Sequence, residues 1–463
     1  MTSDVQSTAA TRDHAQRPAH SSAYRTRRFL NWFPLGLTYA TLYMGRYNFN
    51  VVKGSIGTTY HLDKAEMGLI ATAGFWTYGL AVALNGPLAD KFGGRRAILI
   101  GAGGAALMNL AVGLMFTNEW TSKLLVSMSL LWSLNMYFQS FGALSVVKVN
   151  STWFHVRERG IFGGIFGIMI SSGYFLATTV GAWLIAHFDW TTVWFVPAAA
   201  IAVMFAVDCW LVRNRPSHAG HADFDTGDGS NAQAADETPL PVRELLHKVI
   251  RNPIVMALVA AEFCTGFVRQ GVMLYFTEYL GEVYHLSTKE TLFWWTGVAF
   301  MLGGIGGGIL CGWLSDHVFH SRRPPVAFLF YLVQIVMLAL LGASLGRGST
   351  AGQVWAVILL GLTAMFIFGV HGMLSGTASM DFGGRKAAAT VAGALDGIQY
   401  IGAGLTGFGL GWVLKTYGWD GGGAQAHEAA HAWIWVSCII PFSILGALIM
   451  TRIWNARPSG VAH

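Results

Sequence analysis

Two arginines lie deep within long apolar stretches of the chain, Arg46 near its start and Arg269 in its second half. An arginine at the centre of a bilayer costs at least about 2.5–3.5 kcal/mol on insertion scales, so arginines there are rare and usually functional. A guanidinium carries its N–H donors in a planar fork that matches a carboxylate or a phosphate. Two such groups at equivalent places predict a paired cationic site for an anion with several oxygens, such as a phosphate.

The stretch around Arg46 carries further polar side chains at helical spacing. At about 100° per residue, Tyr39, Tyr43, Arg46 and Asn50 fall on one face of a helix. That face is too polar for lipid and can line a cavity in which tyrosine hydroxyls and the guanidinium meet one ligand. The alternative is that Arg46 reaches outward to the membrane interface, because polar residues follow it closely.

Other polar or ionisable residues within the apolar stretches are Gln139, Glu262, His371 and Asp396. Glu262 lies two turns before Arg269 on roughly the same face, so the two could form an internal ion pair or serve one site. Asp396 and Tyr400 are four residues apart and share a face. Asp396 could line the cavity, pair with a base or relay a proton, and His371 could titrate near neutral pH or simply be a hydrogen-bonded packing residue.

The composition indicates a membrane protein. Of the 463 residues, 53% are hydrophobic and only 12% are charged, against roughly 25% charged in soluble domains. The four cysteines lie in apolar runs and predict no disulfide framework. No Gly-x-x-x-x-Gly-Lys-Ser/Thr loop is present, so ATP-driven transport by this chain is not expected, and we expect no cofactor.

Hydropathy predicts an all-α membrane protein with twelve transmembrane helices. The chain divides into an N-terminal tail (1–28), a first bundle (29–212), a polar linker rich in Asp, Gly, Ala, Ser and Pro (213–250), a second bundle (251–455) and a C-terminal tail (456–463). The predicted spans are 29–52, 66–90, 97–117, 123–147, 160–186, 190–212, 253–280, 291–316, 325–345, 353–378, 387–414 and 432–452.

The distribution of positive charge predicts the topology. Most of the 30 lysine and arginine residues fall in the tails, the linker and the loops on the same side. Positive charge marks the cytoplasmic face, so both termini are expected there. The net charge of +6 is therefore mainly a topology signal, and no nucleic-acid partner is expected.

The two halves repeat a polar loop after an apolar stretch. The first copy runs Gly86-Pro-Leu-Ala-Asp90-Lys-Phe-Gly-Gly-Arg95-Arg96, and the second runs Gly312-Trp-Leu-Ser-Asp316 followed by Arg322-Arg323. Asp90 and Asp316 are 226 positions apart, and Arg46 and Arg269 are 223 apart. This shared offset predicts two pseudo-symmetric six-helix bundles with a substrate site between them. The acidic and basic residues of the loops are expected to act in gating.

The chain resembles the organophosphate:phosphate antiporters of the major facilitator superfamily, which include the glycerol-3-phosphate and hexose-6-phosphate exchangers. The resemblance covers nearly all of residues 25–455. It is carried by Tyr43-Met-Gly-Arg46-Tyr-Asn48-Phe49, the segment from Tyr78 into Asp90, Trp153 through Arg157-Glu158-Arg159-Gly160, Arg269-Gln-Gly271, Gly312-Trp-Leu-Ser-Asp316 and Gly418-Trp419-Asp420-Gly421-Gly422.

This resemblance implies the major facilitator fold and a substrate site built on Arg46 and Arg269. It implies further substrate-binding positions at Tyr39, Tyr43, Tyr78, Asn48 and Tyr400. The chain departs from the glycerol-phosphate exchangers in having no histidine in 166–172 and in having Tyr47 where they have a lysine. The organic part of the substrate is therefore left open.

The resulting expectation is a monomeric inner-membrane antiporter that exchanges a small phosphorylated metabolite for inorganic phosphate by alternating access. Two alternatives stay open: a proton-coupled symporter of organic anions that uses Glu262, Asp396 or His371, and a transporter-like sensor of sugar phosphates. An enzyme is not expected. His427-Glu428-Ala-Ala-His431 matches a zinc-protease pattern but lies in a short external loop without a third ligand, so no metal site is expected.

Overall fold

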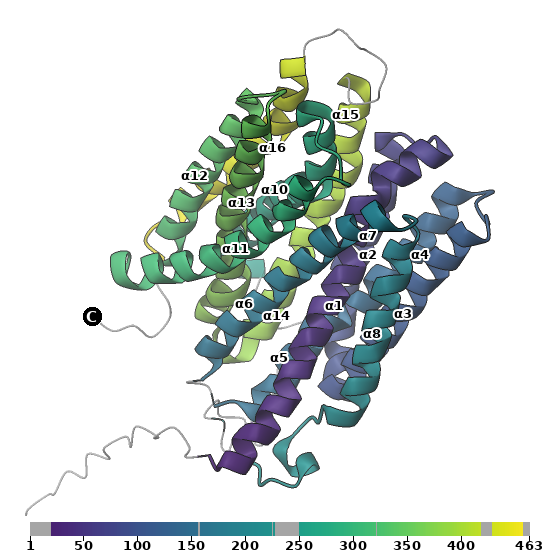
Figure 1. The fold of residues 1–463 in the computed structure, drawn as a ribbon. Coiled ribbons are helices and arrows are strands. Elements are labelled where there is room, and N and C mark those ends of the chain that lie inside the picture. Colours follow the sequence, from purple (N-terminus) through teal and green to yellow (C-terminus); the bar gives the residue numbers. More distant parts are fainter. Residues whose placement is uncertain are drawn as a thin grey trace, which may run out of the picture.

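The computed structural model describes residues 20–155, 158–224, 226, 250–320, 322–417 and 428–456, and these residues form helices and connecting loops. Figure 1 shows the first half in purple to teal and the second in green to yellow. The first half contains α1 (Ser22–Tyr60), α2 (Lys64–Phe92), α3 (Gly94–Thr117), α4 (Leu124–Gln139), α5 (Phe141–Trp153), α6 (Arg159–Phe175), the π-helical η1 (Leu176–Val180), α7 (Gly181–His187) and α8 (Thr192–Leu211).

A short 3₁₀ turn, η2 (Pro216–Ala219), follows α8 at the start of the predicted linker. The second half contains α10 (Pro253–Tyr284), α11 (Thr291–Trp313), η4 (Leu314–Val318), α12 (Arg323–Ala343), α13 (Thr350–His371), η5 (Gly372–Ala378), α14 (Ser379–Leu405), η6 (Thr406–Leu410), α15 (Gly411–Tyr417) and α16 (Glu428–Arg452). Here η4, η5 and η6 are π-helical segments that continue the helices before them.

Nine helices of the described residues are long and apolar enough to cross a membrane. They correspond to nine of the twelve predicted spans. The other three predicted spans are also helical, as α1, as α4 with α5, and as α14 to α15. α1 is rich in buried polar residues, and the fourth span is divided at Ser140 into two pieces of 16 and 13 residues. Arg46 lies on α1, Gln139 lies at the end of the short helix α4, and Asp396 and Tyr400 lie on α14.

Within each half, the helices pack side by side as a bundle. In the first half α3 packs on α8, α2 on α4 and α1 on α8; in the second α11 packs on α13, α10 on α14 and α12 on α16. Contacts between the halves are made by α2 with α14 and η6, by α11 with α6 and η1, and by α1 with α10. The second predicted span thus meets the eleventh and the eighth meets the fifth, as a pseudo-two-fold relationship requires.

The repeat offset is visible where α1 and α10 cross. Gln270 Nε2 donates to the hydroxyl of Tyr47 at 3.2 Å, and these residues are 223 positions apart. Asn50 Nδ2 donates to the carbonyl oxygen of Met273 at 2.7 Å, with the same separation. Equivalent positions of the two halves therefore touch each other, and Arg46 and Arg269 lie one residue before the first of these pairs.

Glycines allow the halves to approach closely. A Cβ atom on Gly68 of α2 would lie 2.0 Å from the carbonyl oxygen of Gly407 in η6, and one on Gly297 of α11 would lie 2.3 Å from Thr179 Oγ1 in η1. Thr72 Oγ1 donates to the carbonyl oxygen of Gly404 at 2.6 Å, and Thr179 Oγ1 donates to that of Trp294 at 2.6 Å. Small residues at helix contacts permit this kind of close backbone packing.

The repeated loops hold their helices together within each half. Arg95 Nη2 donates to the carbonyl oxygen of Cys209 at 2.6 Å, at the end of α8. Arg323 Nη1 lies 2.9 Å from Asp316 Oδ1 and also donates to Ser315 Oγ. Arg322 Nε donates to the carbonyl oxygen of Phe319, Arg96 is exposed, and the side chain of Asp90 lies outside the described residues. A gating role for these loops stays a prediction.

Candidate functional site

Arg46 lies in the middle of α1, and its side chain is 1% exposed. Nη1 donates to the hydroxyl of Tyr400 in α14 at 2.9 Å, across the boundary between the halves. The guanidinium carbon lies 4.6 Å from the ring centroid of Tyr43 and 4.5 Å from that of Tyr78, so two aromatic faces flank the cation. Arg46 therefore does not extend to the membrane interface, which was the alternative left open by the sequence.

The helix break in the fourth span provides acceptors for Arg46. α4 ends at Gln139 and α5 begins at Phe141, and carbonyl groups at a helix end lack their usual helical partners. The Nη2 atom of Arg46 lies 3.4 Å from both the carbonyl oxygen and the side-chain Oε1 of Gln139. The predicted cavity residue Gln139 thus contacts Arg46 directly.

Arg269 occupies the corresponding place in α10 and is 2% exposed. Nη2 donates to Gln399 Oε1 at 3.0 Å, and the guanidinium carbon lies 5.4 Å from the ring centroid of Tyr400. Glu262 does not pair with Arg269: its Oε2 atom lies 3.5 Å from His371 Nδ1. The internal Arg269–Glu262 ion pair left open by the sequence is therefore not formed.

Tyrosine rings from both halves surround the two arginines. The ring centroids of Tyr78 and Tyr400 are 4.0 Å apart, and those of Tyr39 and Tyr43 are 5.2 Å apart. Two further members of the group are Tyr47 and Tyr174. The sequence argument named Tyr47 only as a departure from the glycerol-phosphate exchangers, and nothing in the chain singled out Tyr174. Tyr174 of α6 lies 4.5 Å from Tyr47 and 5.4 Å from Tyr43.

The arginines keep unused hydrogen-bonding capacity. Within the described residues, neither guanidinium forms an ion pair with a carboxylate. The Nε atoms of Arg46 and Arg269 are buried and have no hydrogen-bond partner in the same part of the chain, and the same holds for Gln139 Nε2 and Gln270 Oε1. A buried cation without a counter-ion is expensive, so this arrangement favours an anionic guest with several acceptor oxygens.

Asp396 lies near the two arginines, whereas Asn48 does not. Asp396 of α14 is partly buried and lies close enough to His371, Arg269 and Arg46 to interact with them electrostatically. The side chain of Asn48 donates to Asn109 Oδ1 at 2.9 Å and to the carbonyl oxygen of Val193 at 3.1 Å. Asn48 therefore lies inside the first bundle, and the structure does not bring it to the arginines.

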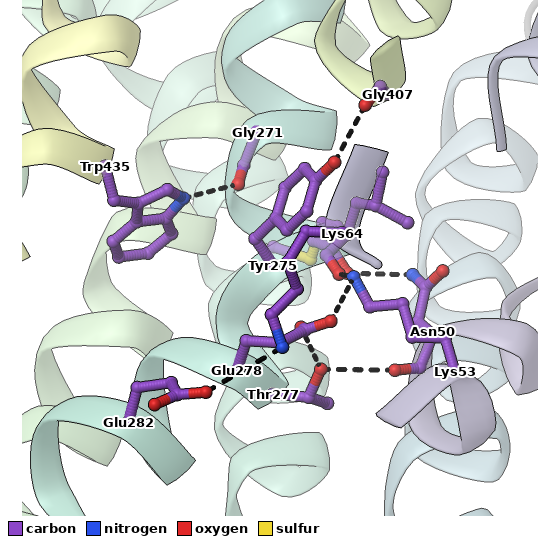
Figure 2. A network of polar contacts seen from close by, with 12 residues as sticks. Asn50, Lys53, Lys64, Gly271, Tyr275, Thr277, Glu278, Glu282, Gly407 and Trp435 are labelled. Carbon is purple, nitrogen blue, oxygen red and sulfur yellow. Dashed lines mark hydrogen bonds and ion pairs between the residues drawn. The ribbon is translucent and has the colours of Figure 1, made fainter. Parts of the chain in front are cut away.

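One end of the boundary between the halves is closed by a second polar network (Figure 2). Lys53 Nζ of α1 lies 2.8 Å from Glu278 Oε1 of α10, donates to the carbonyl oxygen of Leu274 and lies 4.1 Å from the ring centroid of Tyr275. Tyr275 in turn donates to the carbonyl oxygen of Gly407 at 2.8 Å.

Two further ion pairs join the halves at the same end, Lys64 with Glu282 at 3.7 Å and Lys415 with Asp63. This outer network, defined here by Lys53, Tyr275, Glu278 and these pairs, links α1 and α2 to α10 and α15. It lies beyond the arginines toward Tyr60 and Tyr284.

No group of three or more metal-binding side chains occurs within the residues described. The side chains of the zinc-like pattern His427 to His431 lie outside the described residues.

The fold and the buried arginine pair define a polytopic membrane transporter of two similar halves. The Major Facilitator Superfamily profile matches residues 35–407, so the chain belongs to this superfamily and is not an enzyme. Its curated relatives are of the organophosphate:phosphate antiporter group.

The relatives include a membrane sensor protein, UhpC, of Salmonella typhimurium (29% identical; 83% of this chain and 85% of the relative). A glycerol-3-phosphate transporter of Bacillus subtilis is 28% identical (87% and 89%), and a probable hexose phosphate transport protein of Chlamydia pneumoniae is 26% identical (86% and 88%).

Solved structures agree with the fold. A bacterial homologue of the human lysosomal transporter Spinster, in an inward-facing and unoccupied conformation, superposes with a TM-score of 0.71 at 16% identity, over 96% of this chain and 100% of that chain. A D-xylose–proton symporter superposes with a TM-score of 0.69 at 13% identity, over 92% and 97%. At these identities the similarity concerns the fold alone.

Proposed function

We propose that this protein exchanges a small organophosphate, such as a sugar phosphate, for inorganic phosphate across the membrane. The observation that carries the proposal is the meeting of Arg46 and Arg269, one from each half, at the single side chain Tyr400 with no carboxylate partner within the described residues. The glycerol-3-phosphate and hexose phosphate transporters among its relatives support a phosphorylated substrate.

The proposed mechanism is alternating access. The phosphoryl oxygens bind Arg46 and Arg269 together, the tyrosines close around the organic part, and the halves rock about the bound anion. A phosphate ester and inorganic phosphate present the same head, with a second ionisation near pH 6. The empty protein holds two unpaired buried cations, which disfavours the change of state without a bound anion. Exchange is thereby obligatory.

For its cellular setting, we place the protein as a monomer in a bacterial inner membrane with both termini in the cytoplasm. The positive tails and linker support that orientation. In this orientation the outer network lies on the far side of the membrane, where its ion pairs hold the two halves together.

Counterflow in proteoliposomes tests the proposal. Labelled phosphate should enter vesicles loaded with unlabelled phosphate, and a panel of phosphorylated metabolites should compete with it. Vesicles without internal phosphate serve as the control. Equally fast uptake into those vesicles would rule out obligatory exchange, and competition by carboxylates but not by phosphate esters would rule out the substrate class.

A sensor of phosphorylated sugars is the second candidate, favoured by the 29% identity to the sensor protein UhpC. The two functions separate in the same vesicles. Saturable binding of phosphate esters without any flux would favour the sensor, whereas binding with counterflow supports the exchanger. An imposed pH gradient that drives uptake without internal phosphate would instead favour a proton-coupled symporter.

A further inference from the structure

A chain of side-chain contacts leads from a buried carboxylate to one of the two arginines. Oε2 of Glu262 lies 3.5 Å from Nδ1 of His371. The same Nδ1 atom lies 2.9 Å from Nε2 of Gln399. Oε1 of Gln399 accepts a hydrogen bond from Nη2 of Arg269 at 3.0 Å. The hydrogen bonds of Arg46, to Tyr400 and Gln139, include no imidazole or carboxylate, so the two arginines differ in their hydrogen-bond partners.

The donors and acceptors in this chain fix the protonation state that it favours. A guanidinium has donors only, so the end of the Gln399 amide that faces Arg269 must be its oxygen. The amide N–H₂ end then faces Nδ1 of His371 and donates to it. An imidazole nitrogen that accepts a hydrogen bond carries no proton, so His371 is neutral in this arrangement, with its proton on Nε2.

We propose that Glu262, His371 and Gln399 form a proton-controlled relay that decides whether Arg269 is available to the anion. When a proton from water binds Nδ1, this atom becomes a donor and turns to the Glu262 carboxylate. Gln399 can then no longer donate to it. Either the amide moves away, or it flips and presents its N–H₂ group to Arg269. Both outcomes end the Arg269–Gln399 bond and release Nη2 for a phosphoryl oxygen.

His371 is reached from solvent and has charged groups from two helices around it. Its side chain is 20% exposed, so a proton can reach it, whereas Glu262 is fully buried. Three charged groups face the imidazole: Glu262 and Arg269 from α10, and Asp396 from α14. Burial of the ring and the guanidinium of Arg269 oppose the protonated imidazole, and Asp396 favours it. Two further charged groups lie on neighbouring elements, Asp316 of η4 and Arg323 of α12, and these pair with each other.

The consequence rests on the proposed anion site: phosphate should bind more tightly to the protein as His371 becomes protonated. Inorganic phosphate itself titrates in the same pH range, so affinity against pH for one protein is ambiguous. The ratio of the dissociation constants of a variant and the wild type cancels the ionisation of the ligand, because both proteins bind the same phosphate species at each pH.

The test is equilibrium binding of labelled inorganic phosphate to the purified protein from pH 5.5 to 8. For His371→Gln, the ratio of dissociation constants should be near 1 at pH 8 and rise to about tenfold at pH 5.5, the effect of losing one charge-assisted hydrogen bond. Glu262→Gln should change the ratio in the same direction. Asp208→Asn removes another buried carboxylate, which bonds Thr38 in the first bundle, and should give a ratio near 1 throughout.

A second set of variants tests whether Gln399 carries the effect of His371 to Arg269. If Gln399 passes the signal, His371→Gln should have no pH-dependent effect in a protein that already carries Gln399→Ala. Ratios independent of pH in the wild-type background would overturn the relay, as would an undiminished pH effect in the Gln399→Ala background. Absence of phosphate binding by the wild type at every pH would instead overturn the proposed function. Thermal melting of each variant separates loss of folding from loss of binding.

Discussion

The hydroxyl of Tyr400, in the second half of the chain, accepts a hydrogen bond of 2.9 Å from Arg46 in the first. The same tyrosine ring lies 5.4 Å from the guanidinium carbon of Arg269. One side chain therefore joins the two cations across the boundary between the halves.

Replacing either buried arginine by lysine should cripple exchange. Lysine keeps the positive charge but loses the planar fork that can hold two phosphoryl oxygens at once. We expect Arg46→Lys and Arg269→Lys each to weaken phosphate binding by about 10- to 100-fold, as loss of charge-assisted hydrogen bonds requires. Counterflow of labelled phosphate measures the effect, and Arg25→Lys, at an exposed position, is the matched control. Near-normal exchange in both buried variants would contradict a bidentate site.

Removing the hydroxyl of Tyr400 should allow phosphate to cross the membrane more often without exchange for the second substrate. In Tyr400→Phe the ring remains, but Arg46 loses a hydrogen bond that crosses the halves in the empty state. We expect phosphate efflux into phosphate-free medium to rise severalfold relative to exchange. Tyr417→Phe, at a 60% exposed position, should leave this ratio unchanged. An unaltered ratio in Tyr400→Phe would show that this bond does not restrain the empty protein.

The outer network makes a prediction about stability. Glu278→Gln leaves the ammonium of Lys53, which is 2% exposed, without its counter-charge. Breaking a buried ion pair on one side typically costs about 3–5 kcal/mol, whereas removing both charges is often nearly neutral. The melting temperature should therefore fall clearly in Glu278→Gln and recover in Lys53→Met combined with Glu278→Met. A double variant as unstable as the single one would mean that the charges themselves are not the cause.

Asp63, in the loop before α2, gives a prediction about pH. Partial burial raises the pKa of this carboxyl, but hydrogen bonds from Lys415 and from the backbone outweigh it, and the net pKa is lowered from 3.8. A carboxyl with a lowered folded pKa stabilises the protein fully above its unfolded pKa and loses this effect as the pH falls through the folded value. Asp63→Asn keeps the helix cap but loses the ion pair.

The difference in melting temperature between wild type and Asp63→Asn should thus be constant at neutral pH and shrink as the pH falls below about 4. Melting curves from pH 3 to 7 measure it. A difference that persists unchanged at pH 3 would assign the effect to the cap geometry and not to the charge.

Much of this architecture could be predicted from the chain because membrane insertion leaves strong signals. The long apolar runs gave the helices, and the equal spacing of Arg46 and Arg269 matches the contacts of Tyr47 with Gln270 and Asn50 with Met273. Helical periodicity alone also separates Asn48 from Arg46 by about 200°, which agrees with the position of Asn48 inside the first bundle.

Contacts between distant helices could not be predicted in the same way. Nothing in the sequence pairs Glu262 with His371 instead of Arg269, because that choice depends on how α13 packs against α10. Tyr174 joins the tyrosine group only because α6 faces α1. The helix break after α4 leaves the Gln139 carbonyl group available to Arg46, and the sequence carries no signal for this break.

The most direct test of the central claim is a cryo-electron microscopy map of the protein with inorganic phosphate bound. The account predicts density for one phosphate within hydrogen-bond distance of both the Arg46 and Arg269 guanidinium groups, between the two halves. A phosphate held by only one of them, or an arginine that turns to an internal carboxylate when phosphate is bound, would contradict it.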